Sequence, residues 1–159
     1  MGDESDFAVV IAAALIAFGH FLAFFALAAA LVIELALITE SLSVKTARRI
    51  QRADRVVGIA ATLLLVFGFL RVFYFEKGSD YYFANTFFQI KLGLFIVTAL
   101  ISLYPTIQYV RWNSELSQGI VPDLKSATVK RLKSAIHWEL VLIGGILLCA
   151  SLMAKSIGV

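Results

Sequence analysis

The sequence has few cysteines, charges and histidines, and each shortage limits what the chain can do. Cys149 is the single cysteine, so the chain can form no internal disulfide and has no paired-cysteine motif for a metal or a c-type haem. Charged residues make up only 16% of the 159 residues, whereas 60% are hydrophobic. That balance lies outside the range of soluble globular proteins. We therefore expect one integral membrane domain.

Long apolar stretches account for this composition. A helix needs about 20 mostly apolar residues to cross ~30 Å of hydrocarbon. Four segments meet that requirement, at residues 7–38, 56–75, 87–110 and 132–154. The sequence thus predicts an all-α membrane protein, a four-transmembrane-helix bundle formed by a single domain over residues 1–159.

Basic residues gather in two of the segments between the spans. Residues 40–55 hold five Lys or Arg and two acids, residues 111–133 hold the same numbers, and the N-terminus holds three acids and no base. By the positive-inside rule, both basic segments face the cytoplasm and both termini lie on the non-cytoplasmic side of a bacterial inner membrane. The net charge of +3 therefore reflects membrane orientation, and the expected partner is the lipid bilayer rather than nucleic acid.

Six ionisable side chains lie inside the predicted spans. They are His20, Glu34, Arg71, Lys91, His137 and Glu139. Each costs on the order of 3 kcal/mol at membrane depth, so such groups usually face the bundle interior, pair with one another, or serve function. Glu34 has candidate partners in Arg48, Arg52 and Arg55. Glu139 has no local partner and is a candidate proton carrier.

The two histidines are the strongest candidates for a binding site. With a rise of 1.5 Å per residue, His20 lies about 20 Å from the outer end of its helix and thus ~10 Å above the inner boundary. The same count places His137 about 8 Å above that boundary. We therefore predict that the two imidazoles lie at one level and share a ligand. The alternative, in which each one hydrogen-bonds to nearby protein, stays open.

A b-type haem suits two imidazoles better than a single metal ion does. Zinc normally requires three or four protein ligands, whereas haem needs one or two axial side chains and an apolar slot. His20 and His137 are therefore the candidate axial ligands. Lys91 and Arg71 lie in the outer half, where cations match the haem propionates. Arg71 also has the alternative of reaching the membrane surface.

Three stretches carry a resemblance to a known family: RVFYFEKGSDYYFANTFFQIKLGLF, YPTIQYVRW and HWEL. Through them, nearly the whole chain resembles an uncharacterised bacterial family of small predicted four-helix inner-membrane proteins, a domain of unknown function. This resemblance implies a fold and supplies no activity.

A remoter similarity connects the chain to the haem-containing membrane protoporphyrinogen oxidases of the HemJ type and to CopD-like copper-resistance domains. His20 in FGHFLAFF matches the first-helix histidine of those oxidases, and Lys91–Leu92 with Tyr104 match part of their third-helix motif. Pro105 stands where that motif has a histidine, and only Glu139 matches the fourth-helix motif. The similarity therefore implies haem binding in four helices, while the departures speak against the oxidase activity itself.

Three classes of function remain. The first is a membrane haem b protein that transfers electrons or acts as an oxidoreductase on a membrane-soluble substrate such as a quinone or a porphyrin. Two axial histidines would close the iron and favour electron transfer, whereas His20 alone would leave a position for catalysis. The second is a copper or ion transporter, for which four helices would have to assemble as a homo-oligomer. The third is a non-catalytic adaptor whose basic loops contact anionic lipid or a partner.

Overall fold

The structure, a computed structural model, describes residues 2–76, 78–155 and 157. In this part of the chain the elements are α1 Gly2–Leu37, α2 Val44–Leu70, the π-helical turn η1 Arg71–Phe75, α3 Ser79–Ala84, α4 Thr86–Arg111, α5 Asn113–Ser117 and α6 Ser126–Ala154. Four segments are long and apolar enough to cross a membrane: α1, α2 with η1, α4 with α5, and α6. The predicted all-α bundle with four spans is therefore confirmed.

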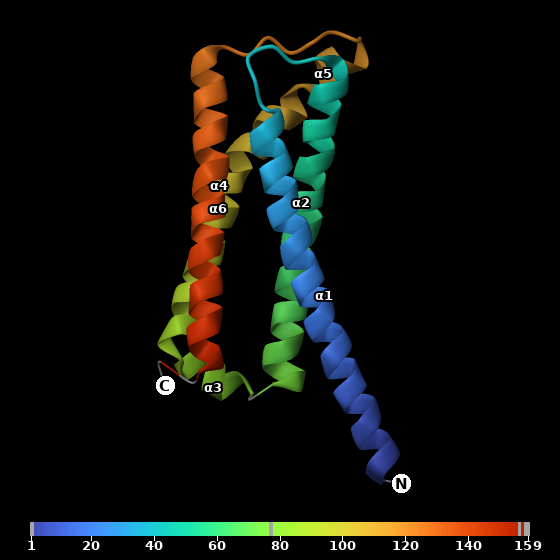
Figure 1. Cartoon of the computed structure of the whole chain (residues 1–159), viewed down its shortest axis with the longest axis vertical. Helices are drawn as coiled ribbons and strands as arrows, with labels where there is room; N and C mark the ends of the chain where they lie inside the picture. The colour runs from blue at the N-terminus through green and yellow to red at the C-terminus, as the bar shows by residue number, and fades with distance from the viewer. Residues whose placement is uncertain (1, 77, 156, 158–159) are drawn as a thin grey trace.

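The long helices form two antiparallel pairs (Figure 1). α1 packs along α2, and α4 packs along α6, whereas α1 meets α6 and α2 meets α4 over much shorter stretches. Between the pairs, the packing is tight on the side where α2 and α6 begin. Ile38, Ile50, Leu132 and Ile136 are all fully buried there. The opposite half of the bundle has a much smaller buried cluster.

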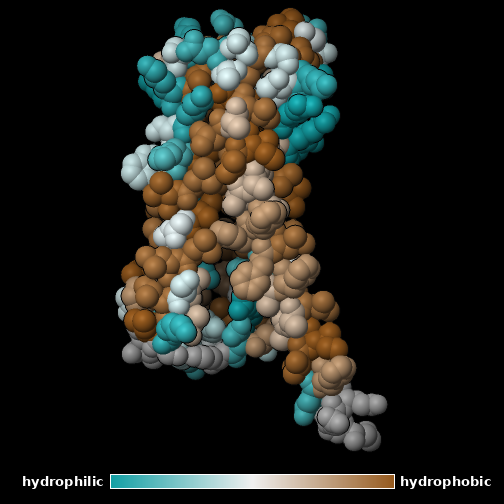
Figure 2. Space-filling model, viewed as in Figure 1, coloured by the Kyte–Doolittle hydropathy of each residue, from teal (hydrophilic) through white to brown (hydrophobic). Residues whose placement is uncertain are grey.

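The two ends of the bundle carry different side chains. Ten of the fourteen Lys and Arg residues lie within residues 45–55 and 111–133, and we call this the basic end. The other end, formed by residues 71–76 and 78–87 and rich in Phe and Tyr, we call the aromatic end. Figure 2 shows the hydrophilic surface concentrated at the basic end, beside a long apolar band. Phe18, Phe25 and Leu100 are more than half exposed, as expected for side chains that contact lipid.

Side-chain caps set the starts of two helices. Ser43 Oγ accepts a hydrogen bond from the backbone N–H of Thr46 at 3.1 Å, where α2 begins. At the start of α4, Asn85 Oδ1 accepts from the N–H groups of Phe87 at 2.9 Å and Phe88 at 3.2 Å. Asn85 Nδ2 also donates to the carbonyl of Ile157 at 3.1 Å. The buried Asn85 thus joins α4 to the segment that follows α6.

We expect Asn85→Ala to lower the free energy of unfolding by roughly 1–2 kcal/mol, because two N–H groups of α4 and one carbonyl lose their partner. Asn85→Ser keeps a capping oxygen and should lose less. Thermal unfolding in detergent measures both variants. An Asn85→Ala protein as stable as the native one would show that the cap has no part in holding the aromatic end together.

The helices extend past the predicted spans at the basic end. α2 begins at Val44 and α6 at Ser126, whereas the predicted spans begin at residues 56 and 132. Hydropathy marks where a segment becomes apolar, but a helix can start earlier and continue through charged turns. α2 starts at the Ser43 cap, whereas α6 starts after Lys125 without a side-chain cap. Asp54 therefore lies inside α2, although its position outside the apolar segment had predicted a loop.

Candidate functional site

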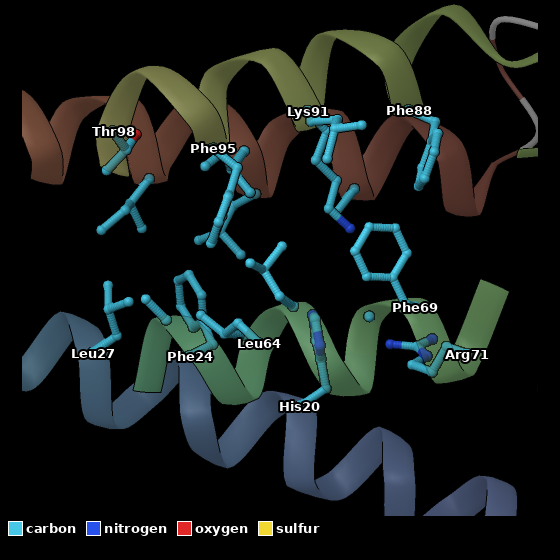
Figure 3. A pocket seen from close by; sticks show the side chains of 18 of the residues that line it. His20, Phe24, Leu27, Leu64, Phe69, Arg71, Phe88, Lys91, Phe95 and Thr98 are labelled. Carbon is cyan, nitrogen blue, oxygen red and sulfur yellow. The ribbon is translucent and has the colours of Figure 1, made fainter. Parts of the chain in front are cut away.

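A cavity of about 640 Å³ lies between the two helix pairs. Its walls come from α1, α2, α4 and α6, and it reaches the segment that connects η1 to α4. Most of the lining is apolar, with Phe24, Leu64 and Phe95 among the wall residues (Figure 3). The surface in Figure 2 is hollowed between the pairs in the half toward the aromatic end. The cavity therefore borders the apolar band rather than the basic end.

Three basic side chains enter this cavity near the aromatic end. His20 extends from α1, Arg71 from η1 and Lys91 from α4, and His20 and Lys91 come from opposite walls (Figure 3). Glu139 of α6 also lines the cavity, beside Ser102 of α4. The structure thus brings together four of the residues that the sequence analysis selected.

His20 lies against α2 at a glycine. A Cβ atom on Gly68 would be 3.5 Å from His20 Cε1 and 3.9 Å from Nδ1, which is ordinary van der Waals contact, so the imidazole packs directly over this glycine. His20 Nδ1 is buried and has no hydrogen bond of standard geometry to any described residue, although the backbone of Leu64 is close. The ring also makes an edge contact with Phe21, at 6.5 Å between centroids.

Lys91 and Arg71 differ in their partners. Arg71 donates to Glu76 Oε1 from Nη2 at 2.7 Å and from Nε at 3.2 Å, and its guanidinium lies 6.0 Å from the centroid of the Phe21 ring. Lys91 is half-buried and forms no ion pair or hydrogen bond with the described residues. A lysine at membrane depth without a carboxylate is costly. Lys91 is therefore the group in this cavity that most needs a bound anion.

Glu76 and Tyr82 lie where the cavity meets the aromatic end. Tyr82 donates to Glu76 Oε2 at 3.4 Å. Burial and the nearby Glu76 carboxylate raise the pKa of the Tyr82 hydroxyl, so this group stays a proton donor. Sequence reasoning missed Glu76, because it follows the predicted span 56–75 directly and was counted among the loop charges.

The structure does not bring the two histidines together. His137 is exposed on α6 and does not line the cavity. Counted from the basic end of each helix, His20 lies about 26 Å along the axis and His137 about 17 Å. The depth estimate for His20 assumed that its helix starts level with the others, but the start of α1 projects beyond the bundle (Figure 1). Within one chain, His137 therefore does not line the cavity that contains His20.

Glu34 is buried among other acids rather than paired with an arginine. Its side chain is 1% exposed and forms no ion pair with a described residue. Arg48, one of its candidate partners, instead donates to a backbone carbonyl of α5 at 2.8 Å. Glu34 lies beside Tyr109 and within electrostatic range of Asp54 and Glu139. The sequence did not reveal this cluster, because Asp54, which lies in α2, had been assigned to a loop.

Comparison with known proteins identifies the family of the chain but assigns no activity to it. No curated protein and no solved structure matches the chain. The sequence model of the family DUF2214, described as predicted membrane protein, matches residues 12–158, a range that contains every cavity residue named above. This match confirms the resemblance to an uncharacterised membrane protein family, and the chain belongs to DUF2214.

Proposed function

We propose that the protein is a membrane-embedded haem b protein in which His20 would be the histidine that holds the haem. The observation that carries this proposal is an apolar cavity of about 640 Å³ that contains one imidazole and one lysine without a counter-ion. Its role is redox chemistry on a membrane-soluble substrate.

The residues of the cavity fit a haem. A b-type haem requires an axial side chain and an apolar slot, and its two propionates bind cations. Phe24, Leu64 and Phe95 form apolar walls, and Lys91 has no carboxylate of its own (Figure 3). Arg71 is the second candidate for a propionate, since only two of its five donors are used by Glu76. When bound, haem would supply one-electron chemistry.

The surroundings of His20 suit a ligating imidazole. A metal-bound histidine usually donates its other ring N–H to a carbonyl or a carboxylate, which orients the ring. His20 Nδ1 is buried and forms no hydrogen bond of standard geometry, and the Leu64 backbone lies close to the ring. A hydrogen bond to that backbone would leave Nε2 as the acceptor nitrogen, which is the one available to iron.

The exclusion of His137 from the cavity bears on the kind of chemistry. Since His20 is the one histidine of the described residues that lines the cavity, a haem there would be held by one imidazole and would supply redox chemistry on a bound substrate rather than electron transfer alone. Because the cavity borders the apolar band between the helix pairs, a quinone or a porphyrin can reach it from the bilayer (Figure 2).

The other two classes have less support. No three His, Cys, Asp or Glu side chains in the described part of the chain gather closely enough to hold an ion, so copper handling lacks a protein ligand set. An adaptor needs neither a cavity nor an unpaired lysine within it. Both features are accounted for by an amphiphilic, acidic ligand such as haem.

Absorption spectroscopy tests the proposal. Protein produced with a haem supply and purified in mild detergent should show a Soret band and, after reduction, a sharp alpha band. Titration of the apoprotein with hemin should saturate at about one haem per chain, the number expected for one axial histidine. A colourless protein that takes up no hemin would overturn the proposal, and binding of copper by that protein would favour the transporter.

We also propose that the basic end faces the cytoplasm of a bacterial inner membrane, because this end carries ten of the fourteen cations. In a Cys149→Ser background, Asp80→Cys at the aromatic end should react with a membrane-impermeant maleimide in intact cells. Ser41→Cys at the basic end should react only after the cells are lysed. The reverse pattern would show that the orientation is inverted.

A further inference from the structure

We infer that a second polar cluster, made of Glu34, Asp54, Tyr109 and Glu139, carries protons between the basic end of the bundle and the cavity. We call it the carboxyl cluster. The idea that these protons are used in substrate chemistry rests on the proposed function. The proton path itself does not depend on that function.

The carboxyl cluster is assembled from all four long helices. Glu34 comes from α1, Asp54 from α2, Tyr109 from α4 and Glu139 from α6. Except for Asp54, each of these side chains is 1% exposed. The four groups lie within electrostatic range of one another. Residues far apart in the chain thus form one polar patch inside an apolar bundle.

Three oxygens in the cluster form no hydrogen bond of standard geometry with the described residues, although Tyr109 is close to Glu34 and Ser102 is close to Glu139: Glu34 Oε1, Tyr109 OH and Glu139 Oε1. Buried polar atoms are nearly always hydrogen-bonded, and where protein provides no partner the partner is ordered water. Chains of carboxyl groups and water are the means by which membrane proteins relay protons. These three atoms therefore point to water and protons as the ligands of the cluster.

The cluster connects two environments. Asp54 is its partly exposed member, and Asp54 Oδ1 accepts a 2.6 Å hydrogen bond from the hydroxyl of Thr106. At the other side, Glu139 lines the cavity beside Ser102. A proton that enters at Asp54 can pass through water held by Glu34 and Tyr109 and arrive at Glu139. In each transfer one O–H bond breaks as the next forms, so only the proton moves.

The cluster is also free of basic partners. No Lys or Arg of the described chain forms an ion pair with its three carboxyls. The amide of Gln51, one turn before Asp54 on α2, donates instead from its Nε2 to the backbone carbonyl of Tyr109 at 2.7 Å and to Asn113 Oδ1 at 2.9 Å. Among the described residues, these carboxyls therefore have no basic side chain in ion-pair contact to which they could lose a proton.

Infrared spectroscopy of the full protein in lipid vesicles tests this path without any haem. A protonated carboxyl gives a C=O stretching band that shifts in D₂O when its proton exchanges. We expect Glu34→Gln and Glu139→Gln each to remove part of this band. Asp54→Asn should slow the exchange of the remaining band roughly tenfold, because it replaces the carboxyl that the path needs at its start. Glu115→Gln, an exposed carboxyl on α5, is the matched control and should change neither property.

Tyr109→Phe provides a second variant that removes one oxygen and keeps the ring. It should slow exchange at Glu139 while the helical circular dichroism stays native, which separates a role in proton transfer from misfolding. Exchange that is unchanged in both Asp54→Asn and Tyr109→Phe would overturn the inference. A colourless protein that shows the carboxyl C=O band, with slowed exchange in the variants, would refute the haem proposal alone. A haem-loaded protein that lacks this band would refute the proton path alone.

Discussion

The His20→Ala protein is expected to lose its haem, whereas the His137→Ala protein keeps a native spectrum. His20 lines the cavity and is held beside Gly68, while His137 is exposed and outside it. Loss of an axial ligand should weaken hemin binding by roughly a hundredfold or more, since changes in outer-shell partners alone cost 10–100-fold. Hemin titration followed at the Soret band measures both variants.

The two histidine variants control for each other, because they remove the same side chain from two membrane helices of one bundle. Free imidazole in the buffer provides a further check. It should restore the spectrum of His20→Ala if the ligand alone is missing, and it should not do so if the cavity has collapsed. The opposite result, loss of haem in His137→Ala only, would move the site to the exposed face of α6 and would require a second copy of the chain to complete it.

Charge reversal at Lys91 is expected to have the next largest effect. Lys91→Glu would place a carboxylate in a cavity where Arg71 is already engaged by Glu76. It would remove a cation from the ligand and add repulsion, so hemin binding should weaken roughly tenfold to a hundredfold. Lys91→Arg keeps the charge and should retain most of the affinity.

A haem analogue without propionates separates this charge effect from a change in cavity shape. Lys91→Glu and the native protein should bind the uncharged analogue about equally, because the analogue presents no carboxylate to repel. If Lys91→Glu weakens binding of both haems to the same extent, Lys91 supports the shape of the cavity and does not contact propionates.

Much of the fold could be predicted because hydropathy is a local property. The apolar segments 87–110 and 132–154 lie within α4 and α6. The predicted spans were wrong only in where the helices start, which is earlier than the apolar segment. Those starts depend on capping and on contacts with neighbouring helices. Asp54 shows the consequence, since it appeared to belong to a loop and lies in α2, beside Thr106.

The candidate site could be predicted only in part. His20, Arg71, Lys91 and Glu139 were selected as ionisable groups within spans, and all four line the cavity. His137 was selected by the same reasoning and is exposed. Position within an apolar segment shows that a charge is costly, but it does not show toward which neighbour the side chain points.

The sequence by itself determined that this chain forms four membrane helices, because the cost of placing charges and unpaired backbone groups in hydrocarbon follows directly from residue order. Only the tertiary structure decided which polar groups meet, since that depends on how far each helix is shifted along its neighbour and turned about its own axis. Contacts between distant residues set both. A Cβ on Gly19 would lie 2.9 Å from the ring of Phe67, so this α2 side chain packs directly on α1 at the glycine. The neighbouring His20 packs on Gly68 and lines the cavity, whereas His137 does not line it.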